Sequence, residues 1–378
     1  MTPHPHLSHL ECGHCSARWE SDRLQGRCDT CSGPLLAHYR PIDLPALDEV
    51  RSRPPGQFRF HEMLPTVAGA DTSTLGEGAT PLLHARALGP SVWVKDEAQN
   101  PTGSFKARGM AVAIARNVEL GATDFHLPSN GNAGAAAAAY AALHGVRVTV
   151  AVPANTPETL VAMARLAGAE VIRVDGSIAD AAAAVSSRAD GGSFSLATLG
   201  EPYRVEGKKM MGYEIFWDLG RLPDVIFYPT GGGTGLVGMA KAFDEMEQLG
   251  WIGSERPRLV AVQSSVCAPI VRAFHSGAAH ADPWEEPGES TAYGLRVPAA
   301  IGDRLMLAAL RNTGGTGIAV TEAEMSQATV RMATEAGIIG SPEGGACLAA
   351  YRRMCDEGRL SPDDEVVLFN TGAAANYR

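Results

Sequence analysis

Lysine is scarce in this chain, and one lysine lies in a setting that favours covalent chemistry. Five lysines occur among 378 residues, and Lys106 directly follows the segment NPTGSF (residues 100–105). Asn-Pro and Thr-Gly are turn signals and Ser104 is a residue type that begins helices, so we expect Lys106 in a first helical turn. The positive end of the helix dipole disfavours a cation there and favours the neutral, nucleophilic amine. Such an amine can form a Schiff base with a carbonyl compound.

A glycine-rich turn is the second candidate site. The apolar run DVIFYP (residues 224–229) leads into TGGGTGLVG (residues 230–238). Glycines allow a tight turn that aims several backbone N–H groups at one anion, and the helix that follows adds its dipole. The spacing also matches the dinucleotide fingerprint, but the next strand ends in Gln263-Ser264 and not in an acidic residue that would hold a ribose. The turn therefore predicts a phosphate site for a smaller cofactor, and the alternative is a turn without a ligand.

Four of the seven cysteines lie near the start of the chain in two C-x-x-C pairs. Cys12 and Cys15 form the first pair, and Cys28 and Cys31 form the second. Two such knuckles can close a tetrahedral Zn²⁺ site, which would supply about 10 kcal/mol of folding free energy to a segment with almost no core. The sequence predicts a zinc-ribbon-like segment over residues 1–40 with a structural role. The alternative is four reduced thiols in a loop.

The regions that must position these residues alternate between strand and helix patterns. The predicted strands are residues 91–95, 123–128, 146–152, 170–174, 224–229, 258–263 and 365–369. The predicted helices between them include residues 106–120, 132–144 and 157–167. This alternation predicts an α/β fold with mainly parallel sheets, in which ligands bind where strands end and helices begin.

Composition excludes several classes of protein. The 32 basic and 42 acidic residues give a net charge of −10, which does not fit a binder of nucleic acid or of an anionic membrane. The first ten residues lack the basic and apolar regions of a signal peptide, and the longest apolar run is too short to cross a bilayer. Sparse cysteines fit a reducing compartment. We therefore expect a cytoplasmic protein with a small-molecule partner.

Several motifs occur together in an order that resembles one family. They are GEGATPL (residues 76–82), SFKAR (residues 104–108), PSNGNAG (residues 128–134), PYRVEGKK (residues 202–209) and NTG (residues 370–372). With the glycine turn, this arrangement resembles the pyridoxal-phosphate enzymes of the tryptophan-synthase-β type, fold type II, and among them the threonine synthases. The resemblance extends from about residue 76 to the end of the chain. Members of this family also carry cysteine-paired ribbons at the N-terminus.

The resemblance implies a domain organisation. It implies two αβα domains, each with a parallel sheet, with the cofactor between them. Residues 41–100 and 205–378 would form a large domain that binds the cofactor phosphate, and residues 101–204 a small domain with the loop for the substrate carboxylate. It also implies a homodimer.

The resemblance assigns roles around pyridoxal 5′-phosphate. Lys106 would bind the cofactor covalently and later carry protons, Asn132 would hydrogen-bond the ring oxygen, and Thr371 would pair with the ring nitrogen. A hydroxyl is a poor proton source, so the ring nitrogen would stay neutral and the protein would have to place its other groups accurately. The residues that would bind the cofactor phosphate are Gly231, Gly232, Gly233, Thr234 and Gly235.

The resemblance also assigns substrate contacts. Arg204, with Lys95, would meet a second anionic group of an amino-acid substrate. The residues that would bind the substrate carboxylate are Ser129, Asn130 and Gly131.

The implied reaction converts O-phosphohomoserine and water to threonine and phosphate. The sequence departs from the family's usual residues at several positions, and among them Ala107, Ala133 and Gly232 stand where polar side chains are common. These departures keep two alternatives open. The first is a serine/threonine dehydratase or a β-replacement enzyme such as a cysteate synthase, with the same cofactor. The second is an interaction protein in which the zinc ribbon is an adaptor on an inactive scaffold.

Overall fold

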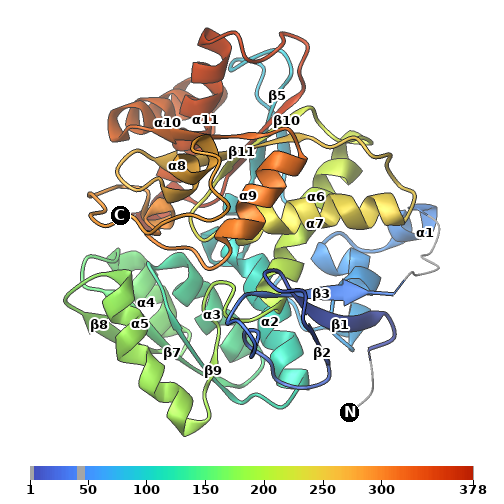
Figure 1. Cartoon of the computed structure of the whole chain (residues 1–378), viewed down its shortest axis with the longest axis vertical. Helices are drawn as coiled ribbons and strands as arrows, with labels where there is room; N and C mark the ends of the chain where they lie inside the picture. The colour runs from blue at the N-terminus through green and yellow to red at the C-terminus, as the bar shows by residue number, and fades with distance from the viewer. Residues whose placement is uncertain (1–3, 41–46, 378) are drawn as a thin grey trace. The chain divides into compact units, whose positions relative to one another are not determined.

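The computed structural model describes residues 4–40 and 47–377 (Figure 1). The chain divides into two compact units, each described separately below. Unit 1 comprises the residues up to Ala79 together with Asn100–Met210, and unit 2 comprises Thr80–Gln99 and Met211–Tyr377.

Unit 2 is built on a six-stranded sheet with the order β12-β11-β10-β13-β5-β4. Its strands are β4 (Leu82–His84), β5 (Val92–Asp96), β10 (Val225–Pro229), β11 (Arg258–Ser264), β12 (Thr316–Val320) and β13 (Val366–Asn370). All neighbours pair in parallel except β4, which runs antiparallel to β5 at the edge. Every residue of the central strands β10 and β13 is buried, as expected for a parallel sheet covered on both faces.

Unit 1 contains a four-stranded parallel sheet with the order β8-β7-β6-β9. Its strands are β6 (Asp124–Pro128), β7 (Arg147–Pro153), β8 (Glu170–Val174) and β9 (Phe194–Ser195). In Figure 1, β7, β8 and β9 lie with α4 and α5 in the teal to green part of the chain.

The N-terminal part of unit 1 forms a separate antiparallel sheet with the order β2-β1-β3. Its strands are β1 (Leu7–Cys12), β2 (Arg18–Trp19) and β3 (Leu35–Tyr39). Its buried apolar side chains are few: Leu7, Leu10, Leu35 and Ala37, together with Cys12 and Cys28. We call residues 4–40 the ribbon.

The helices fall between the strands. Unit 1 has α1 (Leu47–Ser52), α2 (Lys106–Glu119), α3 (Asn132–Leu143), α4 (Glu158–Leu166) and α5 (Ile178–Ser186). Unit 2 has α7 (Thr234–Gln248), α8 (Pro269–His275), α9 (Asp303–Asn312), α10 (Glu322–Ala336) and α11 (Pro342–Asp356). The chain passes from unit 1 to unit 2 within α6 (Tyr203–Leu219). The 3₁₀ segments are η1 (Gln57–Met63), η2 (Gly69–Asp71), η3 (Glu97–Gln99), η4 (Pro101–Gly103), η5 (Ser187–Gly191), η6 (Tyr293–Leu295) and η7 (Ala374–Tyr377).

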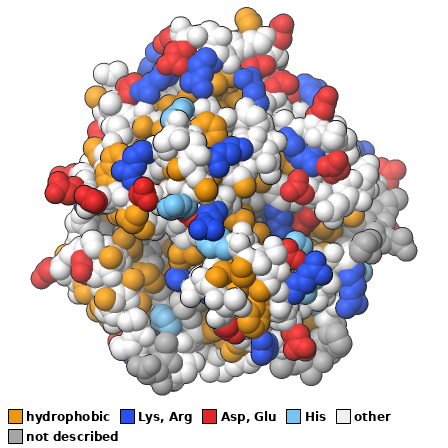
Figure 2. All heavy atoms as spheres, in the orientation of Figure 1, with side chains coloured by type: hydrophobic (Ala, Val, Ile, Leu, Met, Phe, Trp, Pro, Cys, Tyr) orange, Lys and Arg blue, Asp and Glu red, His pale blue; other side chains and the backbone are white. Residues whose placement is uncertain are grey.

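The structure confirms the predicted fold class: two parallel sheets and a small antiparallel sheet with the four cysteines. Each of the seven predicted strands is present within one or two residues of its expected bounds. The predicted assignment of residues 41–100 and 205–378 to one cofactor-binding domain remains a prediction, and its first residues, 41–46, lie outside the described part. Within the described residues, no helix has the length and apolar character that a membrane span requires. Basic and acidic side chains are interspersed on the face drawn in Figure 2.

Candidate active site

Lys106 is the first residue of α2, as the sequence predicts. The turn before it includes η4, and the buried Ser104 accepts a hydrogen bond from the Lys106 backbone N–H through Oγ at 3.4 Å. The Lys106 Nζ lies 4.3 Å from the centroid of the Phe105 ring, and the Nζ of Lys208 lies 3.6 Å from the same centroid. Both lysine amines therefore lie at cation–π distance from the same ring.

The loop before α3 is organised by Ser129. Its Oγ accepts hydrogen bonds from the backbone N–H groups of Gly131 at 3.0 Å and of Gly134 at 2.9 Å. Gly131 has φ of 124°, a conformation that favours glycine, and a Cβ there would collide with Leu160. Asn132 is the first residue of α3, whose N-terminus has no side-chain cap. Ser129 therefore shapes the loop, and its hydroxyl proton remains a donor for a ligand.

The glycine turn of unit 2 leads into α7. Gly233 precedes the helix with φ of 80°, and no side chain caps the N-terminus of α7. A Cβ would collide with the Gly294 carbonyl at Gly231, with Met306 at Gly233 and with Tyr228 at Gly235.

These contacts test whether the turn suits a phosphate group. Packing forces glycine at alternate positions, and the first N–H groups of α7 are left without a side-chain cap. Backbone N–H groups at a helix N-terminus bind phosphate well. The turn therefore fits a cofactor phosphate, and Thr234, the first residue of α7, can add a hydroxyl.

Thr371 lies directly after β13 and is 4% exposed. Its neighbour Asn370 is held on two sides, because its Nδ2 donates to Asp96 Oδ1 at 2.7 Å and its Oδ1 accepts from the Ser341 N–H at 3.0 Å. Ser341 in turn caps α11 through its hydroxyl. This network fixes the end of β13 and with it the position of Thr371.

Arg204, the second residue of α6, is 1% exposed. Its Nη1 donates to the Leu196 carbonyl at 2.6 Å, whereas its Nε and Nη2 have no hydrogen-bond partner among the described residues. Burial lowers the pKa of Arg204 to about 10, so the side chain is charged at neutral pH. A buried cation with two unused donors is costly unless an anion meets it.

Glu201 lies beside this arginine and accepts the backbone N–H groups of Tyr203 and Arg204, each at 2.8 Å. Burial raises its pKa to about 7, although the charge of Arg204 acts in the opposite direction. The sequence analysis missed Glu201. Its position two residues before the helix, where a carboxylate can accept free N–H groups, was the available signal.

Lys95 does not have the environment of a substrate contact. The side chain is fully buried in unit 2, where Nζ donates to the Thr80 carbonyl at 2.7 Å and pairs with Glu214 at 3.0 Å and Asp218 at 3.3 Å. An ammonium has three donors, and these three partners use them. The geometry therefore favours a structural role for Lys95.

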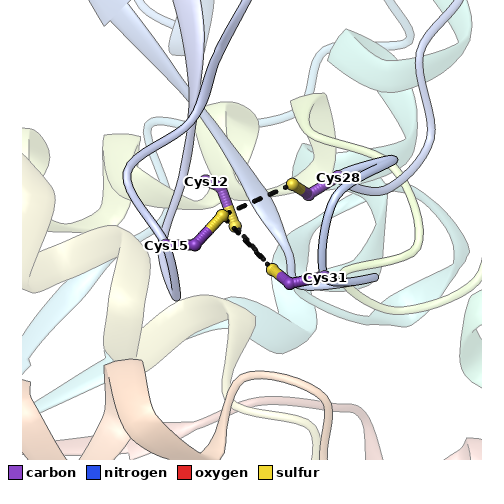
Figure 3. A group of neighbouring side chains, drawn as sticks. All are labelled: Cys12, Cys15, Cys28 and Cys31. Atoms are coloured by element: carbon purple, nitrogen blue, oxygen red, sulfur yellow. Dashed lines mark hydrogen bonds between the residues drawn. The ribbon is translucent and has the colours of Figure 1, made fainter.

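The four cysteines come together as predicted (Figure 3). All four Sγ atoms lie within 4.8 Å of one another, and the pairs Cys12–Cys31 and Cys15–Cys28 are 3.4 and 3.6 Å apart. Four sulfurs around Zn²⁺ at 2.3 Å would be about 3.8 Å from one another. The cluster therefore has the dimensions of a tetrahedral metal site.

Backbone strain marks further positions that the sequence analysis missed. Within the described residues, Ala79, Thr102 and Leu199 have positive φ without being glycine, with values of 48°, 59° and 54°. Each lies in or beside one of the family-like motifs of unit 1. Ser16 and Ser32, each directly after the second cysteine of a knuckle, are strained in the same way at 55° and 58°. Such strain persists where function or tight packing requires it.

Glu343 is another residue that the sequence analysis did not assign to the site. It lies in the first turn of α11, is 3% exposed, and accepts the Gly294 N–H through Oε1 at 2.9 Å. The Gly294 carbonyl is the atom that a side chain at Gly231 would strike. Glu343 thus holds η6 against the glycine turn.

Comparisons with known proteins agree with this geometry. The family model described as "Pyridoxal-phosphate dependent enzyme" matches residues 73–372. A threonine synthase of Methanosarcina acetivorans is 33% identical over 97% of this chain and 91% of its own length, and one of Methanocaldococcus jannaschii is 32% identical over 96% and 91%. The structure of maize serine racemase has the same fold, with a TM-score of 0.67 at 20% identity over 78% of this chain and 88% of that chain. The chain therefore belongs to the pyridoxal-phosphate dependent enzymes of fold type II, and it is threonine synthase-like in sequence.

Proposed function

We propose that this enzyme converts O-phosphohomoserine and water to threonine and phosphate. The observation that carries the proposal is Arg204, a buried cation with two unused donors in the motif PYRVEGKK. A substrate with a phosphate group would satisfy both donors. The names of the two archaeal relatives support the same reaction.

The residues that would hold the cofactor are Lys106 by covalent attachment, Asn132 and Thr371 by hydrogen bonds, and the turn at residues 231–235 through its N–H groups. When bound, pyridoxal phosphate supplies an electron-withdrawing ring that stabilises negative charge on the substrate carbons beside the amino group. The Lys106 amine would remove the proton from Cα, then one from Cβ, and would return protons later.

Other residues of the chain would orient the substrate. Ser129, Asn130 and the N–H of Gly131 would bind the carboxylate, and Arg204 would hold the phosphate that leaves. Because Arg204 is already fixed by the Leu196 carbonyl, it would bind the anion without much further ordering. Phosphate would leave from Cγ, which would take up a proton. Water would add at Cβ, and a proton returned to Cα would give threonine and inorganic phosphate.

The direct test is a substrate comparison with purified, cofactor-loaded enzyme. Phosphate and threonine should appear in equal amounts from O-phosphohomoserine. Arg204→Ala should lower kcat/KM by about 100-fold or more, because each charged hydrogen bond contributes about 1.5–3 kcal/mol. Cofactor absorbance should be unchanged in this variant, which serves as the control for folding.

A second candidate keeps the cofactor and changes the substrate. Ala107, which is fully buried, and Ala133, next to Asn132, have only a methyl side chain. Neither supplies the polar group that is common at its position in the family. Keto acid from serine or threonine without phosphate release would favour a dehydratase. Cysteate from O-phosphoserine and sulfite would favour a β-replacement enzyme. Either result, with O-phosphohomoserine inert, would contradict the first proposal.

A homodimer and a cytoplasmic location remain predictions from the resemblance and the composition. Sedimentation of the purified enzyme tests the first, and fractionation of cells tests the second.

A further inference from the structure

The ribbon contacts the helix that carries Arg204 through a buried network. The Tyr39 hydroxyl, at the end of β3, donates to Glu206 Oε2 at 2.8 Å, and the Lys209 Nζ donates to the same oxygen at 2.6 Å. Glu206 and Lys209 are both fully buried in α6. The Lys209 Nζ also lies 4.1 Å from the centroid of the Tyr39 ring. Tyr39 therefore contacts both members of a buried ion pair, Glu206 through its hydroxyl and Lys209 through its ring.

A second set of contacts comes from the loop between the two cysteine knuckles. The Ser21 carbonyl accepts from Arg116 Nη2 of α2 at 2.8 Å and from the Tyr203 hydroxyl of α6 at 3.4 Å. Farther along this loop, a Cβ at Gly26 would lie 3.0 Å from the Gly200 carbonyl. Within unit 1, the ribbon thus contacts α2, which begins with Lys106, and the segment that leads into α6.

The residues of α6 and of the turn before it that contact the ribbon lie within five positions of Arg204 in the sequence. Tyr203 precedes it, Glu206 follows it by two residues, and Gly200 lies in the turn before it. The two helices are themselves in close contact, because a Cβ at Gly109 of α2 would lie 2.9 Å from the Arg204 carbonyl. A shift of the ribbon would therefore displace the first turn of α6, which carries Arg204.

The ribbon depends on its metal for this role. Its core consists of few side chains, so the sheet alone supplies little folding free energy, and the cysteine cluster has the dimensions of a Zn²⁺ site. Cys12 pairs with Leu35 across β1 and β3, which connects the cluster to the strand that ends at Tyr39. Loss of the metal would release β3, and the buried Glu206 would then lose one of its donors.

We propose that the metal-closed ribbon is a positioning element for the anion-binding arginine, with Tyr39 as the positioning residue. The inference rests on the proposed function, which assigns Arg204 to the substrate phosphate. It gives the ribbon a role inside the enzyme and contrasts with the adaptor interpretation. It requires that metal loss weakens anion binding while cofactor binding persists.

The test measures binding of inorganic sulfate by calorimetry to the full-length, cofactor-loaded enzyme. Tyr39→Phe keeps the ring under Lys209 and removes the hydroxyl, and it should weaken sulfate binding about tenfold with unchanged cofactor absorbance. It should also raise KM for O-phosphohomoserine more than it lowers kcat. Arg18→Ala is the matched control, because Arg18 is exposed and, among the described residues, its ion pair is with Glu11 on the ribbon surface. This variant should leave sulfate binding unchanged.

Removal of the metal is the second arm, and it does not depend on how a variant folds. Mercurial release of Zn²⁺, followed by a chelator, should weaken sulfate binding at least as much as Tyr39→Phe. Excess thiol, which takes the mercurial off the cysteines, followed by added Zn²⁺ should restore it. Hydrogen exchange over residues 7–40 reports that the ribbon has been released. Unchanged sulfate affinity with a released ribbon would overturn the inference.

Arg204→Ala distinguishes failure of the proposed anion site from failure of the role proposed for the ribbon. If sulfate binding depends on Arg204 but not on Tyr39 or the metal, only the role of the ribbon is wrong. If sulfate binding does not depend on Arg204, the proposed site is wrong, and the inference fails with it.

Discussion

In the proposed site, the neighbouring Glu201 should make the affinity of Arg204 for an anion depend on pH. The pKa of Glu201, ordinarily 4.5, is raised to about 7, so the carboxyl is neutral below that pH and charged above it. Charged Glu201 would compete with an anion for Arg204. Sulfate, which does not titrate in this range, should therefore bind several-fold more weakly at pH 8 than at pH 6.

Glu201→Gln should remove most of this dependence, because the amide does not ionise and still accepts one backbone N–H. A calorimetric titration of both proteins at the two pH values measures the effect. An equally steep dependence in the variant would show that another group is responsible.

His4 makes the stability of the ribbon sensitive to acid. Its Nδ1 accepts the Leu7 N–H at 2.7 Å, and burial, together with the charge of Arg116, lowers its pKa from 6.5 to about 4. The unfolded chain binds a proton near pH 6.5 and the folded chain does not, so stability is complete above that pH and decreases as the pH falls toward 4.

His4→Asn keeps an acceptor and removes the titration. Urea unfolding at pH 7 and pH 5 should show a smaller loss of stability in the variant than in the wild type. Equal losses would mean that acid acts through other groups, the cysteines among them.

Single residues were predicted to different extents. The position of Lys106 followed from turn signals and helix-dipole chemistry, which are local. Lys95 is buried against Glu214 and Asp218, which lie more than 100 positions away, so no spacing in the sequence predicts these ion pairs. The hydrogen bonds from the loop N–H groups to Ser129 could not be predicted, because they depend on the path of the loop backbone.

At the scale of elements, the close crossing of α2 and α6 is the most demanding feature. A Cβ at Gly207 would collide with the Arg108 carbonyl. Gly207→Ala should therefore destabilise the protein by about 1–3 kcal/mol through overpacking. Gly253→Ala is the control, because a Cβ there meets nothing within 4 Å. Thermal unfolding compares the two, and equal stability would contradict the tight crossing.

The strands that the sequence predicted are those with long apolar runs, such as β10 and β11. Among the described residues, the three ribbon strands were not predicted as strands, and neither were β4, β9 and β12. β9 has two residues and β4 has three, and TGIAV of β12 contains a glycine that weakens the strand pattern. Phe60, Met63 and Leu64 are buried in a segment whose many Pro and turn residues give no helix or strand pattern, so the sequence did not predict their packing.

At the scale of the whole molecule, the cofactor should stabilise the folded chain. A ligand that binds only the folded state adds about 2.7 kcal/mol at 100 times its Kd. The Tm should therefore rise with pyridoxal phosphate concentration, and less so for Lys106→Ala, which lacks the covalent bond. The same rise in both proteins would mean that Lys106 does not contribute to cofactor binding.

The family could be predicted from the sequence because its motifs are short, ordered and chemically specific. The substrate could not be predicted, because Ala107, Ala133 and Gly232 lack the usual polar groups. The unused donors of Arg204 and the raised pKa of Glu201 result from burial, which the sequence does not show. The ribbon was predicted as a metal site from spacing alone. Its contacts with α6 needed the structure, since Tyr39 and Glu206 are separated by 167 positions.

The central claim is that Lys106 binds pyridoxal phosphate covalently. Borohydride reduction of the loaded enzyme, followed by proteolysis and mass spectrometry, tests it most directly. We predict that the reduced cofactor is found on the peptide that contains Lys106 and on none that contains another lysine. A label on Lys95, Lys208, Lys209 or Lys241, or no label at all, would contradict the account.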